Sequence, residues 1–202
     1  MSKDPRSLRR RQARGRRPPR RRLLAGVIAV LVVAAVGAVV LSRHGSGPAE
    51  TAPGFTMVAY GGQSELGGER VAIDSLVGRG KPVVLNFWAA LCPPCRAEMP
   101  GYERIHRDLG SRILIVGVDL GPYTGLGSHE DARRFLRENG ITYPTAYATT
   151  SAPLQEYRIQ GMPTTIIFDG KGRIVSRHTG YFSEDQLRQS LSALVASPGR
   201  SP

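Results

Sequence analysis

Residues 83–95 read VVLNFWAALCPPC, and this stretch decides the fold. Residues 83–90 are almost all apolar and rich in β-branched and aromatic side chains, which is typical of a strand buried on both faces of a sheet. The two cysteines follow at once, where a helical pattern begins that runs to about Leu109. The stretch therefore predicts a central strand that leads directly into a helix, with Cys92 at the junction.

Cys92 and Cys95 are the only cysteines of the chain and lie three positions apart. At a helix N-terminus, unpaired backbone N–H groups and the positive end of the helix dipole favour the thiolate, which is the form of cysteine that attacks a disulfide. Pro93 suits the first helical turn, where its missing N–H costs nothing. This placement indicates thiol–disulfide exchange. The alternative is a plain stabilising disulfide, which would constrain little of the unfolded chain across so short a loop.

Metal chemistry finds little support in the sequence. Two cysteines are too few for a cysteine-based structural zinc site. The four histidines show no ligand spacing with each other or with the cysteines, and we interpret them as surface residues: His44, His106, His129 and His178. We expect no metal and no cofactor other than the redox-active Cys92–Cys95 disulfide.

The chain around the cysteines carries alternating strand and helix patterns. Two short strand patterns near the start suggest a hairpin, and the later patterns follow the order strand, helix, strand, helix, strand, strand, helix. The expected strands are 55–60, 70–73, 113–120, 142–148, 163–169 and 173–180, and the expected helices begin near Ser128, Ala152 and Ser183. This order predicts an α/β domain with a mixed sheet and helices on both faces.

The net charge of +12 is concentrated at one end, because residues 1–22 hold eleven Lys and Arg and one acidic residue. The nineteen residues 23–41 carry no charge. A helix of this length, at about 1.5 Å per residue, crosses a bilayer core of about 30 Å. The positive-inside rule then places the N-terminus in the cytoplasm and the rest of the chain outside. The alternative is a cleaved signal peptide, whose apolar run is usually shorter, about 7–15 residues.

These patterns divide the chain into five parts. They are a basic cytoplasmic tail (1–22), a transmembrane signal anchor (23–41), a flexible linker (42–53), one globular domain (54–197) and a disordered C-terminal tail (198–202). Basic tails also bind nucleic acid, but a tail beside a membrane span faces anionic headgroups. We expect membrane association through residues 23–41, no nucleic-acid binding, and a monomer.

Several motifs in order resemble one known family. They are GKPVVLNFWA (80–89), CPPCRAEMP (92–100) and, further on, GMPTTIIFDGKGRIV (161–175). Residues from about 53 to 197 resemble the TlpA/ResA-like membrane-anchored thiol–disulfide oxidoreductases. The resemblance implies a thioredoxin-like three-layer fold: a mixed central sheet with helices on both faces, an added N-terminal β-hairpin and one preceding transmembrane helix.

The resemblance also assigns roles to the catalytic side chains. Cys92 would be the exposed attacking thiol and Cys95 the buried resolving thiol. Glu98, one helical turn beyond Cys95, would move protons as the thiols titrate. The alternative for Glu98 is a solvated side chain near a helix N-terminus, where its charge favours the dipole.

Three further residues would contact the substrate. Met162 and Pro163 match a loop whose cis proline faces the cysteine pair, and the Met162 backbone would pair with an extended substrate segment. The alternative is an ordinary trans proline at the start of a strand. Trp88 matches an aromatic residue beside the site, and its alternative is plain core packing.

The function that the resemblance implies is reduction of disulfides in exported proteins such as apocytochrome c, with electrons from a CcdA-type transmembrane donor. A disulfide-forming oxidant or isomerase uses the same chemistry, and Pro93-Pro94 between the cysteines does not fix the direction. A peroxiredoxin-like peroxidase would need a hydroxyl where Ala89 stands. A non-catalytic binding module would not need an intact cysteine pair. Leu91 replaces the usual tryptophan before the first cysteine, which leaves the substrate open.

Overall fold

The structure, a computed structural model, describes residues 52–196. The predicted basic tail, transmembrane segment and C-terminal tail, and nearly all of the linker, lie outside the described residues. Among residues 52–196, no helix has both the length and the apolar character needed to span a bilayer.

Seven strands form one mixed sheet in the order β2-β1-β5-β4-β3-β6-β7. The strands are β1 (Thr56–Gly61), β2 (Arg70–Ala72), β3 (Val83–Trp88), β4 (Leu114–Asp119), β5 (Thr145–Ala148), β6 (Thr164–Phe168) and β7 (Ile174–Thr179). β3 lies parallel to β4 and antiparallel to β6. All six residues of β3 are buried, as its continuous apolar pattern predicts. The predicted mixed sheet is confirmed.

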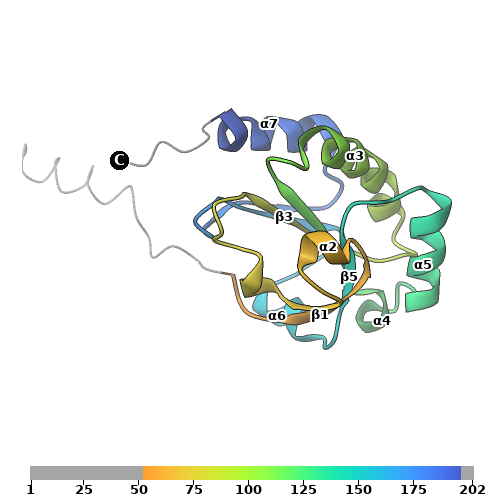
Figure 1. Ribbon diagram of the computed structural model, residues 1–202. Helices are drawn as coiled ribbons and strands as arrows, with labels where there is room; N and C mark the ends of the chain where they lie inside the picture. The colour runs from red at the N-terminus through yellow and green to blue at the C-terminus, as the bar shows by residue number, and fades with distance from the viewer. Residues whose placement is uncertain (1–51, 197–202) are drawn as a thin grey trace, which may run out of the picture. The chain divides into compact units, whose positions relative to one another are not determined.

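Helices cover both faces of this sheet (Figure 1). They are α2 (Gln63–Leu66), α3 (Pro93–Leu109), α4 (Gly121–Thr124), α5 (His129–Glu138), α6 (Ala152–Glu156) and α7 (Glu184–Ala196), with a short 3-10 turn at Ile73–Ser75. α3, α5 and α7 enclose a core with one face of the sheet, built around Trp88, Ile105 and Leu187. The N-terminal segment and α6 cover the other face, around Phe87 and Tyr157.

The predicted N-terminal hairpin is present, with β1 and β2 antiparallel. The connection between them is more than a turn, because residues Gln63–Leu66 form the one-turn helix α2, flanked by Gly62 and Gly67 in the left-handed conformation. β1 also pairs antiparallel with β5, so the hairpin extends the central sheet instead of standing apart from it.

Two strand registers place the ends of three strands together. Trp88, the last residue of β3, pairs with Asp119, the last residue of β4. Phe87 pairs with Thr164, the first residue of β6. The loop to Cys92, the loop after Asp119 and the loop before Thr164 therefore leave the sheet at one edge.

Helices α5 and α7 begin near Ser128 and Ser183, as predicted, and each start is capped by side chains. Ser128 and Asp131 form a reciprocal capping box at the start of α5. At α7, the Gln186 N–H donates to Ser183 Oγ at 3.3 Å, and the Ser183 N–H donates to Gln186 Oε1 at 3.0 Å.

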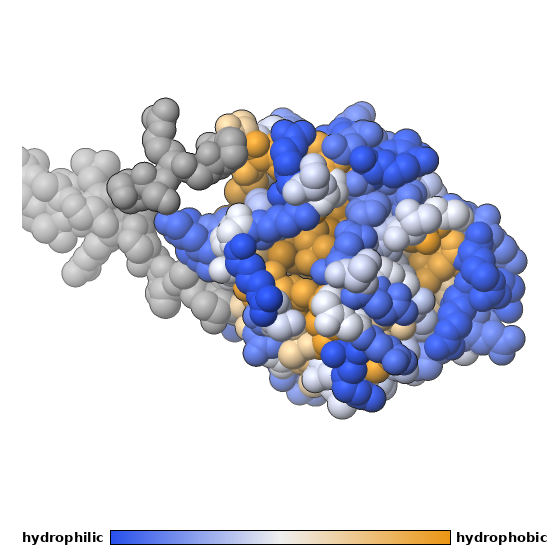
Figure 2. All heavy atoms as spheres, in the orientation of Figure 1, coloured by the Kyte–Doolittle hydropathy of each residue, from blue (hydrophilic) through white to orange (hydrophobic). Residues whose placement is uncertain are grey.

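The face seen in Figure 2 is mostly hydrophilic, and hydrophobic side chains show chiefly in recesses between polar ones. Large hydrophobic side chains that are well exposed are few among the described residues: Leu91, Tyr123, Val175 and Tyr181. Leu91 directly precedes Cys92, so one of these exposed side chains lies at the cysteine pair.

The left-handed turn at Gly62 gives a test of the hairpin connection. A Cβ at Gly62 would lie 2.7 Å from the Pro144 Cα, whereas a Cβ at Gly67 would meet nothing within 4 Å. Gly67→Ala should lower the free energy of unfolding by about 1 kcal/mol through its backbone conformation alone. Gly62→Ala should lower it by at least about 1 kcal/mol more, because the added methyl collides with backbone. Urea unfolding of the two variants measures this, and equal losses would show that Pro144 does not constrain the turn.

Candidate active site

Cys92 and Cys95 form a disulfide, with their Cα atoms 5.3 Å apart. Cys92 is the N-cap residue of α3 in an extended conformation, and its Sγ accepts the Cys95 N–H at 3.3 Å. Pro93 occupies the first helical turn, as predicted. The sulfur of Cys92 therefore lies at the positive end of a helix of 17 residues, where negative charge is stabilised.

The exposure of Cys92 differs from the expectation. In this disulfide form Cys92 is 3% exposed, against 0% for Cys95, so the pair lies just below the surface. The neighbouring residues Leu91 and Pro93 are exposed. The predicted exposure of Cys92 is thus wrong for the disulfide form.

Glu98 is buried rather than solvated, with 1% of its surface exposed. Asn86 Nδ2 donates to Glu98 Oε1 at 2.7 Å, and the backbone N–H of Phe182 donates to Oε2 at 2.9 Å. Burial raises the pKa of the Glu98 carboxyl to about 7, and these two hydrogen bonds oppose that rise. A carboxyl group that titrates near neutral pH thus lies one helical turn from Cys95.

The same polar cluster extends to β6. Asn86 Nδ2 also donates to Thr165 Oγ1 at 3.0 Å, and that hydroxyl shares a hydrogen bond of 2.9 Å with the Tyr102 hydroxyl. The cluster joins β3, α3 and β6 beneath the cysteine pair, which fixes the helix that carries Cys95 against the sheet.

Met162 and Pro163 form the loop before β6, and the bond between them is cis. The trans alternative for Pro163 is therefore wrong. The Pro163 carbonyl accepts the Gly180 N–H at 2.8 Å, which ties the loop to the end of β7. Met162 packs partly buried against the hydrophobic cluster that contains both cysteines. The loop therefore leaves the sheet at the same end as the loop to Cys92, and its contact with a substrate stays a prediction.

Trp88 is 0% exposed and packs against Phe135, with 5.7 Å between ring centroids. Core packing, the alternative that the sequence left open, is what this position supports. Direct contact between Trp88 and a substrate finds no support, because the side chain has no exposed surface in this form.

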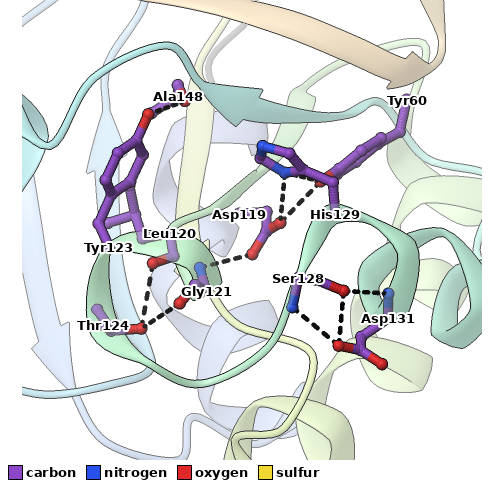
Figure 3. A network of polar contacts seen from close by, with 10 residues as sticks. All are labelled: Tyr60, Asp119, Leu120, Gly121, Tyr123, Thr124, Ser128, His129, Asp131 and Ala148. Carbon is purple, nitrogen blue, oxygen red and sulfur yellow. Dashed lines mark hydrogen bonds and ion pairs between the residues drawn. The ribbon is translucent and has the colours of Figure 1, made fainter.

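The sequence analysis missed a second polar cluster at this edge of the sheet. Asp119 ends β4, is fully buried, and contacts Tyr60 of β1 and His129 of α5 (Figure 3). The sequence signal that could have revealed this cluster was Asp119 itself, an acidic residue at the end of an otherwise apolar strand. His129 is not the simple surface residue that we expected, and His106 is also largely buried, with 16% of its side chain exposed. Within residues 52–196, no three His, Cys, Asp or Glu side chains gather as metal ligands.

Comparison with known proteins agrees with this geometry. Residues 48–177 match the model of the AhpC/TSA family, and this match covers more than half of the chain. The chain is 33% identical over 135 residues to the thiol:disulfide interchange protein DsbE homolog of Paracoccus denitrificans, covering 66% of this chain and 70% of the relative. It is 30% identical over 133 residues to the thiol-disulfide oxidoreductase ResA of Halalkalibacterium halodurans, covering 64% and 70%. The chain belongs to the AhpC/TSA family, among the thiol–disulfide oxidoreductases.

Further relatives extend the match over the chain and its fold. The thioredoxin-like protein YneN of Bacillus subtilis is 28% identical over 173 residues, which is 83% of this chain and 95% of the relative. A thiol:disulfide interchange protein structure from Chlorobium tepidum superposes with a TM-score of 0.60 at 26% identity, covering 73% of this chain and 96% of that one. The predicted thioredoxin-like α/β fold of this oxidoreductase is confirmed.

The pKa of Glu98 leads to a pH dependence of stability. Between about pH 4.5 and 7 the folded protein holds a proton on Glu98 that the unfolded chain releases. The free energy of unfolding should therefore fall as the pH rises through this range, by up to about 3 kcal/mol. Glu98→Gln should flatten this fall, because the amide does not ionise. Urea unfolding of the oxidised protein at several pH values measures the effect, with Glu138→Gln on the exposed face of α5 as control. An unchanged slope in Glu98→Gln would contradict the assignment.

Proposed function

We propose that this oxidoreductase is anchored in the cell membrane with its domain outside the cytoplasm, and that it reduces disulfides in exported proteins such as apocytochrome c. The observation that carries the proposal is the position of Cys92 as N-cap of α3, bonded to Cys95 one turn into the same helix. The uncharged residues 23–41 after a basic tail support the anchor.

The reaction follows from the arrangement of the two sulfurs. In the dithiol form, the Cys92 thiolate attacks one sulfur of a substrate disulfide, and the other substrate sulfur leaves as a thiolate. Cys95, once deprotonated, then attacks Cys92 Sγ in the mixed disulfide. The Cys92–Cys95 disulfide forms, and the second substrate sulfur leaves as a thiolate that takes up a proton. The substrate has gained two electrons, and the enzyme is left in its disulfide form.

Glu98 supports the resolving step. Cys95 must lose its proton before it attacks, and it lies buried, away from solvent. Glu98 is one turn from Cys95, and its pKa of about 7 lets it accept and release a proton near neutral pH. In this proposal Glu98 accepts the Cys95 proton and returns it to solvent.

The substrate surface consists of the elements around Cys92. The Met162-Pro163 loop supplies backbone that an extended substrate segment pairs with. Leu91 and Tyr181 supply exposed apolar surface, at 54% and 51% exposure. Such surface suits an unfolded polypeptide, whose own apolar side chains are not yet buried.

The proposed electron donor is a CcdA-type transmembrane carrier, which would reduce the Cys92–Cys95 disulfide after each cycle. The opposite direction, disulfide formation or isomerisation, is the second candidate. A thiol-disulfide isomerase structure from Corynebacterium glutamicum, 28% identical with a TM-score of 0.54, favours it. It covers 59% of this chain and 84% of that one. The potentials of donor and substrate decide between the two directions, because the exchange itself is reversible. Peroxidase chemistry lacks support, since Ala89 supplies no hydroxyl to the site.

The unequal roles of the cysteines can be tested by trapping. Cys95→Ser should accumulate mixed disulfides with exported proteins through Cys92, because the resolving thiol is missing. Cys92→Ser should trap few or none, because Cys95 lies one turn into α3, away from the N-cap position where a thiolate is stabilised. Adducts would be isolated without reductant from cells that express each full-length variant, then identified by mass spectrometry. Equal trapping by both variants would overturn the assigned roles, and no adducts from either folded variant would indicate a structural disulfide.

A further inference from the structure

The buried carboxylate of Asp119 contacts the 121–127 segment, which also contacts Leu91. It is 0% exposed, and both of its oxygens accept hydrogen bonds. The Gly121 N–H donates to Oδ1 at 2.7 Å, and the Tyr60 hydroxyl donates to Oδ2 at 2.8 Å. Burial raises the pKa of Asp119, while the hydrogen bonds from Gly121 and Tyr60 and the nearby His129 ring, with Nδ1 3.6 Å from Oδ2, oppose this rise. A buried carboxylate needs such donors to stay charged.

These bonds determine how His129 presents its ring. Tyr60 has one hydroxyl proton and gives it to Asp119, so the Tyr60 oxygen accepts from His129 Nδ1, at 2.7 Å. Nδ1 therefore carries a proton, and in the neutral imidazole the lone pair lies on Nε2. Tyr147 packs on the imidazole with 4.2 Å between ring centroids, and Arg133 lies over the Tyr60 ring at 5.0 Å. Figure 3 shows one imidazole nitrogen facing both the Tyr60 hydroxyl and the Asp119 carboxylate. Side chains from β1, β4 and β5 thus orient one partly exposed histidine.

His129 lines an open groove of about 480 Å³. Leu91 and Pro122 give it apolar surface, and three glycines of the 121–127 segment contribute to its lining. Leu91 directly precedes Cys92 in the chain, so this lining residue places the groove next to the attacking cysteine. A substrate bound for attack at Cys92 therefore lies beside this groove.

Two close approaches fix the groove to the active-site loop. The Leu91 N–H donates to the Leu126 carbonyl at 2.8 Å. A Cβ at Gly127 would lie 3.3 Å from the Leu91 Cγ, and a Cβ at Gly121 would lie 2.9 Å from Asp119 Oδ1. Glycine at these positions lets the loop contact both Leu91 and the buried carboxylate. The Asp119 carboxylate therefore contacts both the loop of the groove, at Gly121, and the Tyr60 hydroxyl that orients His129.

We propose that this groove binds the side chain of a substrate residue that directly precedes or follows the oxidised cysteine. This residue has an apolar body and a hydrogen-bond donor at its tip, as tyrosine does, and it donates to His129 Nε2. The inference rests on the proposed function. Leu91 and Pro122 match the apolar body of the residue, and the lone pair of the fixed imidazole matches its donor. His129 is then a specificity-determining residue, with Asp119 and Tyr60 positioning it.

The test uses short peptides whose single cysteine is joined by a disulfide to thionitrobenzoate. Two matched pairs carry tyrosine or phenylalanine directly before or directly after the cysteine. Attack by the reduced, full-length protein on the peptide sulfur releases coloured thionitrobenzoate, whose low thiol pKa makes it the better leaving group. Rate constants for each protein are divided by its rate constant with the symmetrical reagent DTNB, which has no peptide.

In at least one pair, wild type should react about five- to tenfold faster with the tyrosine peptide, the value of one net hydrogen bond. His129→Phe should remove this preference, and Tyr60→Phe should reduce it because Nδ1 loses its acceptor. Tyr123→Phe is the matched control and should keep the preference, since that hydroxyl donates to the Ala148 carbonyl outside the groove.

The outcomes separate this inference from the proposed function. Equal wild-type rates for tyrosine and phenylalanine in both pairs, or a preference that survives His129→Phe, would overturn the inference while disulfide exchange stands. The wild-type comparison decides even if a variant does not fold. Reaction with none of the peptides and not with DTNB would instead remove the proposed function.

Discussion

The structure depends on one junction, where β3 ends beneath the surface at Trp88 and α3 begins at Pro93, with Cys92 as its N-cap. A fully buried strand fixes the position of this helix start, because its six residues pack on both faces. The helix start in turn directs unpaired N–H groups at the Cys92 sulfur. The loop after Asp119 and the loop before Thr164 leave the sheet at the same end as the loop to Cys92, so they surround the start of α3.

Two buried carboxylates hold the loops around this junction, one on each side. Glu98 accepts a backbone N–H from Phe182 and a side-chain N–H from Asn86. Asp119 likewise accepts a backbone N–H from Gly121 and a hydroxyl from Tyr60. In both cases burial raises the pKa, and the donors keep the group compatible with the interior. The first carboxylate lies near the resolving cysteine, and the second supports the surface beside the attacking one.

Much of the fold could be predicted because its signals are local. The apolar run of β3, the capping box at Ser128 and the cysteine pair at a helix start each act over a few residues. The burial of Trp88 and the low exposure of Cys92 could not be read in this way, because they depend on packing against Phe135 and other distant residues. The helix α2 within the hairpin was missed because glycines on both sides resembled a simple turn.

The Asp119 cluster was missed for a similar reason. Its members come from β1, β4 and α5, and Tyr60 and Asp119 are 59 positions apart in the chain. Only the antiparallel pairing of β1 with β5, which lies beside β4, brings them together. An alternating apolar pattern places a strand in a sheet, but it does not give the order of the strands.

The central claim is that the start of α3 activates Cys92 as the attacking thiol. The most direct measurement is the alkylation rate of each cysteine in the reduced, folded protein as a function of pH, with the modified residue identified by peptide mapping. The account predicts that Cys92 reacts first and that its rate follows an apparent pKa clearly below the ordinary value of about 8.5. A rate that follows an apparent pKa of about 8.5 or higher, or preferential alkylation of Cys95, would contradict it.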